Sequence, residues 1–486
     1  MTIDFNTIPV DLRVPGARAE VSNRAARSGG GDVPDRILVI GQSLAGATAV
    51  ADQALRIFSA GQAVEAAGRG SMLAAMAAVV LKAAPTSEVH ILPLDDDAAG
   101  TAATGQITVT AAPTAAGSAV FYVAGRRYPV TVAAGDTTAA VATAIAAKIT
   151  ADADALVTAA ADGSDVNLTA RHKGVAAGAF DIRHSYFASE ALPAGLTVTI
   201  TAFAGGAGDP ELDDAIANLG DVWFPTIINP YTDTTALLAL EAELLDRYGA
   251  MRAIQGFANG AATGTVGELT TFGNSRNSPF TGYIDAGGSP TPAFLWAANV
   301  GSVSHSEPDP SRQRRTLPLT EVLGSAQGDR RTWQERQALL ENGISTHTVD
   351  AAGVVRIERL ITTYETDEFG AEDTSYLDET TVRLANAVRT DLVAFVDATY
   401  PRSKLGDDGS TGPNVVTPAM LKTAGVNRYL VWADRGWVEG GDAFTQFKRD
   451  QVVERDPNDT NRVNWRLGPN FINNLRITAM QIEFRQ

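Results

Sequence analysis

Four nearly continuous apolar segments constrain the fold of this chain most. They are "ILVIG" at 37–41, "EVHILPL" at 88–94, "WFPTII" at 223–228 and "AIQGF" at 253–257. Strands buried on both faces have this composition, and helices of about ten to fifteen residues between such strands are typical of a parallel sheet covered on both sides. The predicted helices lie within 71–84, around 211–219 and from about 234 to 248. We therefore expect an α/β core domain built on a mostly parallel sheet.

A stretch of different composition, residues 95–210, interrupts this pattern. Ala, Thr, Val and Gly dominate it, and short strands such as "QITVT", "VNLTA" and "LTVTIT" recur. One amphipathic helix is predicted, with Asp136 or Thr137 as its cap and Val141, Ile145 and Ile149 spaced four residues apart. We expect a small α+β domain inserted into a loop of the core, where insertions are tolerated. Its acidic and Gly-rich borders favour a place at the outer surface.

Capping signals define the elements that follow. Thr332 and Glu335 form a predicted capping box that opens a helix, and a hairpin is expected on either side of 350–353. Asp378 opens a long helix that ends before Pro401, and Thr417-Pro418 opens another. Residues 370–474 therefore read as a third domain of mixed α and β structure.

These patterns divide the chain into an ordered set of segments. The expected domains are an amino-terminal extended arm and linker at 1–30, the discontinuous core at 31–94 and 211–369, the insert at 95–210, the carboxy-terminal domain at 370–474 and a carboxy-terminal strand arm at 475–486.

Both ends of the chain alternate as strands do. Apolar side chains recur at every second position in two sets, Ile8, Val10, Leu12 and Val14 near the start and Met480, Ile482 and Phe484 near the end. A strand without a neighbour leaves backbone donors and acceptors unpaired, and natural proteins usually cover such edges. The sequence identifies no local partner for either segment. We interpret them as arms that pair with a sheet, either in this molecule or in another.

The carboxy-terminal alternation changes phase. Leu475, Ile477 and Ala479 occupy odd positions, whereas the last three apolar residues occupy even positions. A bulge near Ala479 would keep both halves on one face, and a change of partner strand is the alternative.

Charge is unevenly distributed along the chain. The formal net charge is -17, which disfavours direct binding of nucleic acid across most of the surface. Residues 401–486 instead hold 12 Lys and Arg against 10 Asp and Glu. The candidate contacts with an acidic partner there are Lys448, Arg449, Arg455 and Arg462, with pairing inside the chain to Asp450, Glu454, Asp456 and Asp459 as the alternative.

Several classes of protein are disfavoured by what the sequence lacks. The chain has no cysteine, its first residues show no signal peptide, and its longest apolar run, 72–81, is half the length needed to cross a bilayer. We expect a soluble protein made in the cytoplasm, without insertion into membranes.

Chemical motifs are also missing. The loop at 39–48 lacks the Lys of a phosphate-binding loop, and the five histidines form no metal-binding pair, so no metal or cofactor is expected. His347 is predicted to be a surface residue, "RQRR" at 312–315 a solvated loop, and "RDPNDTNR" at 455–462 a turn between strands. The pattern favours a protein built for contact over two alternatives, a soluble hydrolase-like α/β enzyme and a surface adhesin.

Several segments resemble the tail sheath protein of Mu-type contractile bacteriophages, in order along nearly the whole chain. They are "IPVDLRVPG" at 8–16, "GRRYPV" and "AGDTTAAVATAIAAKI" within 125–149, "LTARHKG" at 168–174, "NPYTD" at 229–233, "RNSP" at 276–279, "GISTHTVDAAGVVRIERLITTY" at 343–364 and "QFKRDQVVERDPNDTNRVN" at 446–464.

The resemblance implies a structural protein of the virion that is not an enzyme. It implies a subtilisin-like core without proteolysis, subunits stacked in hexameric rings around the tail tube, and terminal arms that add strands to neighbouring subunits. Contraction of that helical sheath would drive the tube through the host envelope and deliver the genome. The implied partners are the protein itself, the tail tube protein, and baseplate and tail terminator proteins.

Overall fold

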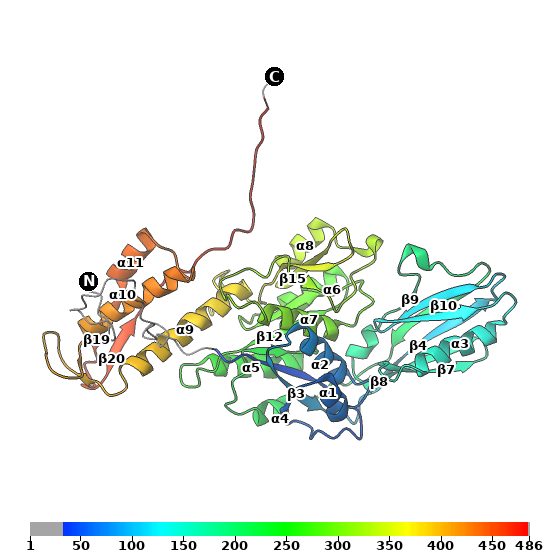
Figure 1. Cartoon of the computed structure of the whole chain (residues 1–486), viewed down its shortest axis with the longest axis horizontal. Helices are drawn as coiled ribbons and strands as arrows, with labels where there is room; N and C mark the ends of the chain where they lie inside the picture. Colours follow the sequence, from blue (N-terminus) through cyan, green and yellow to red (C-terminus); the bar gives the residue numbers. More distant parts are fainter. Residues whose placement is uncertain (1–32, 485–486) are drawn as a thin grey trace, which may run out of the picture. The chain divides into compact units, whose positions relative to one another are not determined.

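The computed structural model describes residues 33–484 (Figure 1). Its residues divide into two compact units. The core unit contains Pro34–Leu384 and Asn473–Gln486, and the carboxy-terminal unit contains Ala385–Ile472. The predicted amino-terminal arm, with Ile8, Val10, Leu12 and Val14, lies outside the described residues.

A nine-stranded sheet organises the core unit, in the order β14-β16-β15-β13-β12-β11-β1-β3-β2. Its six parallel strands are β1 (Arg36–Gln42), β3 (Glu88–Leu94), β11 (Thr226–Ile228), β12 (Phe257–Ala262), β13 (Thr281–Asp285) and β15 (Ile344–Val349). Antiparallel strands lie at both edges: β2 (Leu55–Ile57) at one, and β16 (Val355–Arg359) with β14 (Pro318–Leu319) at the other. The mostly parallel sheet therefore matches the prediction.

Alternate residues of the central strands enter two different hydrophobic clusters. Ile37 and Val39 of β1 pack with α1 (Ala60–Ala67), α2 (Met72–Ala83) and α7 (Ala293–His305). Leu38 and Ile40 pack with α4 (Asp213–Asn218) and α5 (Thr234–Tyr248). Because successive side chains of a strand point to opposite faces, the two clusters place helices on both sides of the sheet. Two further helices, α6 (Val266–Asn274) and α8 (Trp333–Leu340), pack beside Tyr283 and Ile344.

The insert contains two antiparallel sheets, one α-helix and two short 3-10 helices. The four-stranded sheet has the order β10-β4-β8-β7, and the three-stranded sheet has the order β6-β5-β9. Their strands are β4 (Ala102–Ala111), β5 (Gly117–Val123), β6 (Arg126–Val132), β7 (Val157–Asp162), β8 (Asp165–Lys173), β9 (Ile182–His184) and β10 (Thr197–Ala204). Thr137 caps α3 (Thr138–Thr150), and the predicted stripe of Val141, Ile145 and Ile149 is buried.

Polar and apolar contacts join the insert to the core sheet. His172 at the end of β8 lies 2.8 Å from Asp96 through Nδ1, and its Nε2 accepts a hydrogen bond from the backbone amide of Met72 at 3.1 Å. Gln42 of β1 donates to the same carboxylate at 2.8 Å. The ring of Phe180 packs against that of Phe294, with centroids 6.1 Å apart. One hydrophobic cluster therefore runs from the core into the insert, and independent folding of the insert stays a prediction.

The carboxy-terminal unit is mixed α and β. Helix α9 (Glu379–Thr399) begins in the core unit and continues into this one, followed by α10 (Pro418–Asp434) and α11 (Asp442–Asp450). Its short strands are β17 (Lys404–Leu405) with β18 (Val415–Val416), and β19 (Val452–Arg455) with β20 (Val463–Arg466). The buried Asp391 accepts hydrogen bonds from Arg428, Trp432 and Arg435, and thereby ties α9 to α10.

Local signals in the sequence located several elements well. The capping box of Thr332 and Glu335 opens α8, Thr417 caps α10 with Pro418 in its first turn, and the hairpin forms between β15 and β16. The segment at 455–462 joins the antiparallel strands β19 and β20, as predicted. The boundaries expected for the domains stay predictions. The two compact units divide at Leu384, inside α9.

The strand predicted at 253–257 is wrong by almost its whole length. Residues 253–256 have no regular secondary structure, the backbone amide of Ile254 donates to the carbonyl of Arg247, and β12 begins at Phe257. The strand reads "FANGAA", a composition typical of turns, yet every residue of it is buried. Gly260 lies against the ring of Tyr283, which leaves no space for a side chain. The small residues of β12 therefore allow close packing inside the sheet and do not mark a turn.

Two residues predicted to be exposed are buried. His347 packs against Trp296, with ring centroids 4.6 Å apart, and its Nδ1 donates to the backbone carbonyl of Asp285 at 2.9 Å. Arg314, in the predicted solvated loop, is 4% exposed and donates to the backbone carbonyls of Asp309, Pro310 and Arg312. Burial lowers the pKa of Arg314 to about 10. Backbone carbonyls can satisfy a buried cation in this way, which the sequence does not indicate.

Substitution of Gly260 tests the packing of β12. A Cβ at this position would lie 2.2 Å from Cε1 of Tyr283, so we expect Gly260→Ala to lower the free energy of unfolding by about 3 kcal/mol. Gly267→Ala is the matched control, because no heavy atom lies within 4 Å of its added Cβ and alanine favours a helix. Urea unfolding followed by circular dichroism measures both. Equal unfolding midpoints for the two variants would contradict this packing.

The buried histidines predict a pH dependence of stability. Burial lowers the pKa of His347 and of His305 in the folded protein. The unfolded chain, with a histidine pKa of about 6.5, then binds protons more readily than the folded one. The stabilisation is fully present above about pH 6.5 and decreases as the pH falls towards the folded pKa values. Melting temperatures between about pH 5.5 and 7.5 should show this slope, and His347→Gln should reduce it; an unchanged slope in the variant would refute the assignment.

Candidate assembly site at the carboxy-terminal tail

The last described residues, 473–484, form an extended tail without regular secondary structure. Its large apolar side chains are almost fully exposed: Leu475 81%, Ile477 85%, Met480 81%, Ile482 90% and Phe484 82%. Exposed apolar side chains are ordinary when single, but a row of them marks a surface that another molecule covers. The predicted arm residues Met480, Ile482 and Phe484 all belong to this row.

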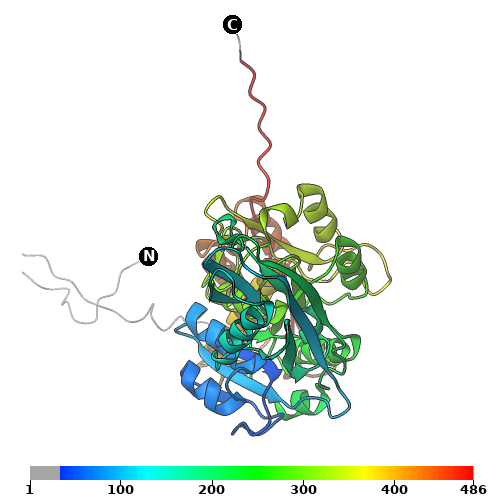
Figure 2. The ribbon, with the colours of Figure 1, turned by 90° about the vertical axis from the view of Figure 1, so that its right-hand side faces the viewer.

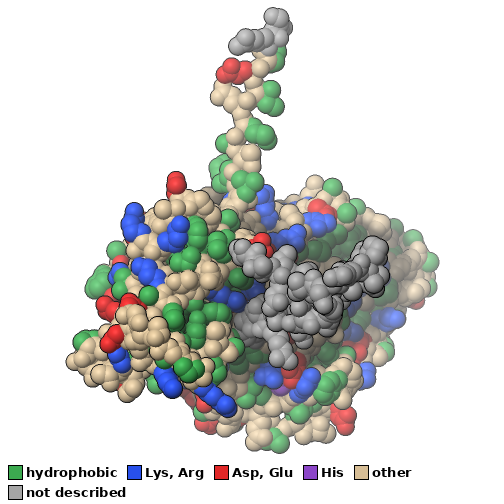
Figure 3. Space-filling view, turned by 60° about the vertical axis from the view of Figure 1, so that its left-hand side comes forward, with side chains coloured by type: hydrophobic (Ala, Val, Ile, Leu, Met, Phe, Trp, Pro, Cys, Tyr) green, Lys and Arg blue, Asp and Glu red, His purple; other side chains and the backbone are tan. Residues whose placement is uncertain are grey.

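The tail stands away from the rest of the core unit. Figure 2 shows it leaving the body as a single extended strand of backbone, and Figure 3 shows its hydrophobic side chains with no other atoms over them. Among residues 33–484, no strand pairs with it. The alternating pattern is therefore that of a strand without a neighbour in the described part of the chain, and the bulge expected near Ala479 stays a prediction.

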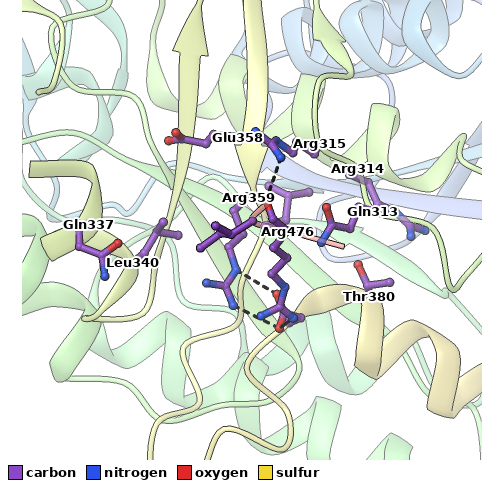
Figure 4. A pocket seen from close by; sticks show the side chains of 12 residues that line it. Gln313, Arg314, Arg315, Gln337, Leu340, Glu358, Arg359, Thr380 and Arg476 are labelled. Carbon is purple, nitrogen blue, oxygen red and sulfur yellow. Dashed lines mark hydrogen bonds and ion pairs between the residues drawn. The ribbon is translucent and has the colours of Figure 1, made fainter. Parts of the chain in front are cut away.

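An arginine clasp fixes the root of the tail to the core unit (Figure 4). The Arg476 guanidinium donates to Oδ2 of Asp378, and Arg359 of β16 donates to both oxygens of the same carboxylate at 3.1 and 3.3 Å. Arg315 donates from Nη1 to the backbone carbonyl of Arg476 at 3.0 Å. Asp378, the residue predicted to open α9, therefore also binds the root of the tail.

One weak feature of the sequence points to this clasp. Arg476 is the polar residue between Leu475 and Ile477, and such positions in an edge strand usually face solvent. Its partner Asp378 lies 98 residues away in the chain, so no local pattern connects them.

The chain is also fixed just before the tail, within the carboxy-terminal unit. The backbone amide of Ile472 donates to the carbonyl of Trp437 at 3.0 Å, and Phe471 forms an isolated bridge with Val438. Residues 477–484 are therefore the part of the tail that is free to meet a partner.

Two of the candidate basic residues lie on α11. Lys448 and Arg449 are both exposed. Lys448 lies over the ring of Phe444, 4.5 Å from its centroid, and Arg449 pairs with Asp450 at 2.9 Å. An exposed ion pair of this kind contributes little to stability, so both cations can still bind a partner.

The other two candidates lie at the β19–β20 hairpin. Arg455 pairs with Asp407 at 2.7 Å and donates to the carbonyl of Thr460 at 2.8 Å. Arg462 is exposed, lies 3.6 Å from Asp456 and donates to Asn464. Three of the four candidates therefore pair inside the chain, which is the alternative to partner contact. Arg449 and Arg462 pair with Asp450 and Asp456, two of the acids that were predicted. Arg455 pairs with Asp407, which was not among them.

Two other kinds of site are absent from the described residues. Within 33–484, no group of three or more His, Cys, Asp or Glu is placed to hold a metal ion. In the same range, no helix combines the length and hydrophobicity that a bilayer-spanning segment needs.

Solved structures similar to this chain are themselves sheath proteins. The sheath tail protein of Desulfitobacterium hafniense matches with 14% identity and a TM-score of 0.48 over 94% of this chain and 100% of its own. The helical sheath of the anti-feeding prophage in its contracted state matches with 11% identity and a TM-score of 0.48 over 97% and 99% of the two chains.

Sequence comparisons are decisive for the family. Residues 205–363 match the phage tail sheath protein central domain, and residues 371–485 match the phage tail sheath C-terminal domain. The Mu-like prophage FluMu tail sheath protein of Haemophilus influenzae is 36% identical over 489 residues, which span 100% of both chains. The chain therefore belongs to the phage tail sheath protein family.

Proposed function

We propose that this chain polymerises around a tail tube as the subunit of a contractile sheath, in stacked hexameric rings linked by strand exchange of its terminal arms. The observation that carries this proposal is the tail, a segment of alternating apolar residues that no strand in the described chain covers. A tail sheath protein is structural, so the alternative of a hydrolase-like enzyme is set aside. Contraction of the assembled sheath would drive the tube through the host envelope.

Burial of the tail supplies a driving force for polymerisation. Covering Met480, Ile482 and Phe484 would stabilise each contact by about 5 kcal/mol before the cost of ordering the tail. The clasp at Arg476 reduces that cost, because it fixes one end of the segment before the neighbour arrives. Backbone hydrogen bonds along an added strand would set the register.

The β19–β20 sheet is our proposed acceptor for this strand. It has only two strands, and an isolated two-stranded sheet is at best marginally stable in water. Helix α10 packs against β19, and the outer edges of both strands have no neighbouring strand among the described residues. A third strand from another subunit would extend this sheet and cover part of its edge.

The proposal also includes the other features that the sequence analysis predicted. The amino-terminal arm of Ile8, Val10, Leu12 and Val14 would enter a neighbouring sheet, and the insert at 95–210 would lie at the outer surface. The core would be subtilisin-like, and Lys448, Arg449, Arg455 and Arg462 would contact the tube or a neighbour. Baseplate and tail terminator proteins would bind the ends of a sheath assembled from subunits made in the host bacterial cytoplasm.

Charged substitutions in the tail test strand exchange directly. We expect Ile482→Asp with Phe484→Asp to abolish cylinder formation, because each contact would bury two unpaired carboxylates, at a cost of several kcal/mol. The melting temperature of the subunit should stay close to that of the wild type, since both side chains are exposed in the single chain. Negative-stain electron microscopy and differential scanning calorimetry measure the two properties.

A matched control separates burial from charge. Gln481→Asp adds a negative charge between Met480 and Ile482, on the polar phase of the strand, and should leave cylinders intact. Cylinders formed by the double variant, or a large drop in its melting temperature, would show that the tail pairs within its own subunit.

A further inference from the structure

A pocket of about 240 Å³ lies beside the root of the tail in the core unit (Figure 4). Its polar lining includes Gln313, Arg315, Arg359, Thr380 and Arg476, and Ile477 of the tail forms part of its wall. These residues come from β16, the start of α9, the tail and the loop before β14. The pocket therefore borders the segment that the proposed function assigns to contact between subunits.

Positive charge exceeds negative charge at this pocket. Arg359 and Arg476 share the single carboxylate of Asp378. Arg315 is exposed, and among the described residues no carboxylate lies within ion-pair distance of its guanidinium. The other acidic residue of the lining, Glu358, is already paired with Arg336 at 2.8 Å and accepts a hydrogen bond from Thr346.

The donors that remain free suit a carboxylate. Arg315 uses Nη1 for the carbonyl of Arg476, which leaves the rest of its planar group available for paired hydrogen bonds. Arg314 also lines the pocket, and Figure 4 shows its side chain turned away from Arg359 and Arg476. Gln313 and Thr380 provide neutral polar groups at the rim.

We propose that this pocket binds an aspartate or glutamate side chain of a neighbouring copy of the chain. This inference rests on the proposed function, because it requires subunits to polymerise. Charge complementarity favours a second copy of the chain as the occupant. The chain carries a formal net charge of -17, whereas arginines outnumber carboxylates around the pocket. The incoming carboxylate would neutralise Arg315 and reinforce the clasp that directs the tail.

Charge reversal at Arg315 tests this site in the full-length protein. We expect Arg315→Glu to raise the subunit concentration for half-maximal polymerisation on the order of tenfold, as measured by light scattering and confirmed by electron microscopy. Arg315→Lys, which keeps the charge, should stay within about threefold of the wild type. Should Arg315→Glu shift the melting transition, Arg315→Gln replaces it, with the same expected direction.

Arg312→Glu is the matched control, because Arg312 lies three residues away in the same loop, is 71% exposed and does not line the pocket. It should polymerise as the wild type does. Wild-type behaviour of Arg315→Glu, or an equal loss in Arg312→Glu, would overturn the pocket assignment. Failure of the wild-type chain to polymerise would instead count against the proposed function.

Discussion

An extended apolar segment with no strand beside it is the constraint on which the biology of this chain depends. Met480, Ile482 and Phe484 expose more than four-fifths of their surface, and the backbone between them has no ladder partner in the described chain. Water solvates such a segment only at a cost in free energy. Under the proposed function, a neighbour covers this tail, and assembly then follows from the same physics as folding.

The start of α9 connects this segment to the rest of the core unit. Asp378 holds Arg359 and Arg476, while the adjacent Glu379 is buried and accepts hydrogen bonds from Ser304 and Arg383. Ser304 belongs to α7, which packs on the central sheet. Two neighbouring carboxylates thus link the root of the tail to the core, so tension on the tail would reach the sheet through ion pairs and not through a flexible linker.

Local patterns in the sequence were enough for most elements but not for long-range contacts. The caps at Thr332 and Thr417 act within one turn of helix, so these local motifs were enough to locate the starts of α8 and α10. Strand β12 was misplaced because its small residues fit against Tyr283. His347 was assigned to the surface because its burial depends on Asp285 and Trp296, which are distant in the chain. Arg314 was assigned to the surface because a fold of its own loop, and not a sequence motif, supplies the backbone carbonyls that it contacts. The alternation of the tail was visible, whereas its clasp joins residues far apart in the chain.

A cryo-electron microscopy reconstruction of the assembled sheath would show directly whether the tail of one subunit pairs with a sheet of another. If subunits exchange strands, residues 480–484 form a strand beside β19 or β20 of a different subunit, with Ile482 and Phe484 buried and Arg476 still paired with Asp378. A tail that folds back onto a sheet of its own subunit, or that remains uncovered in the polymer, would contradict strand exchange.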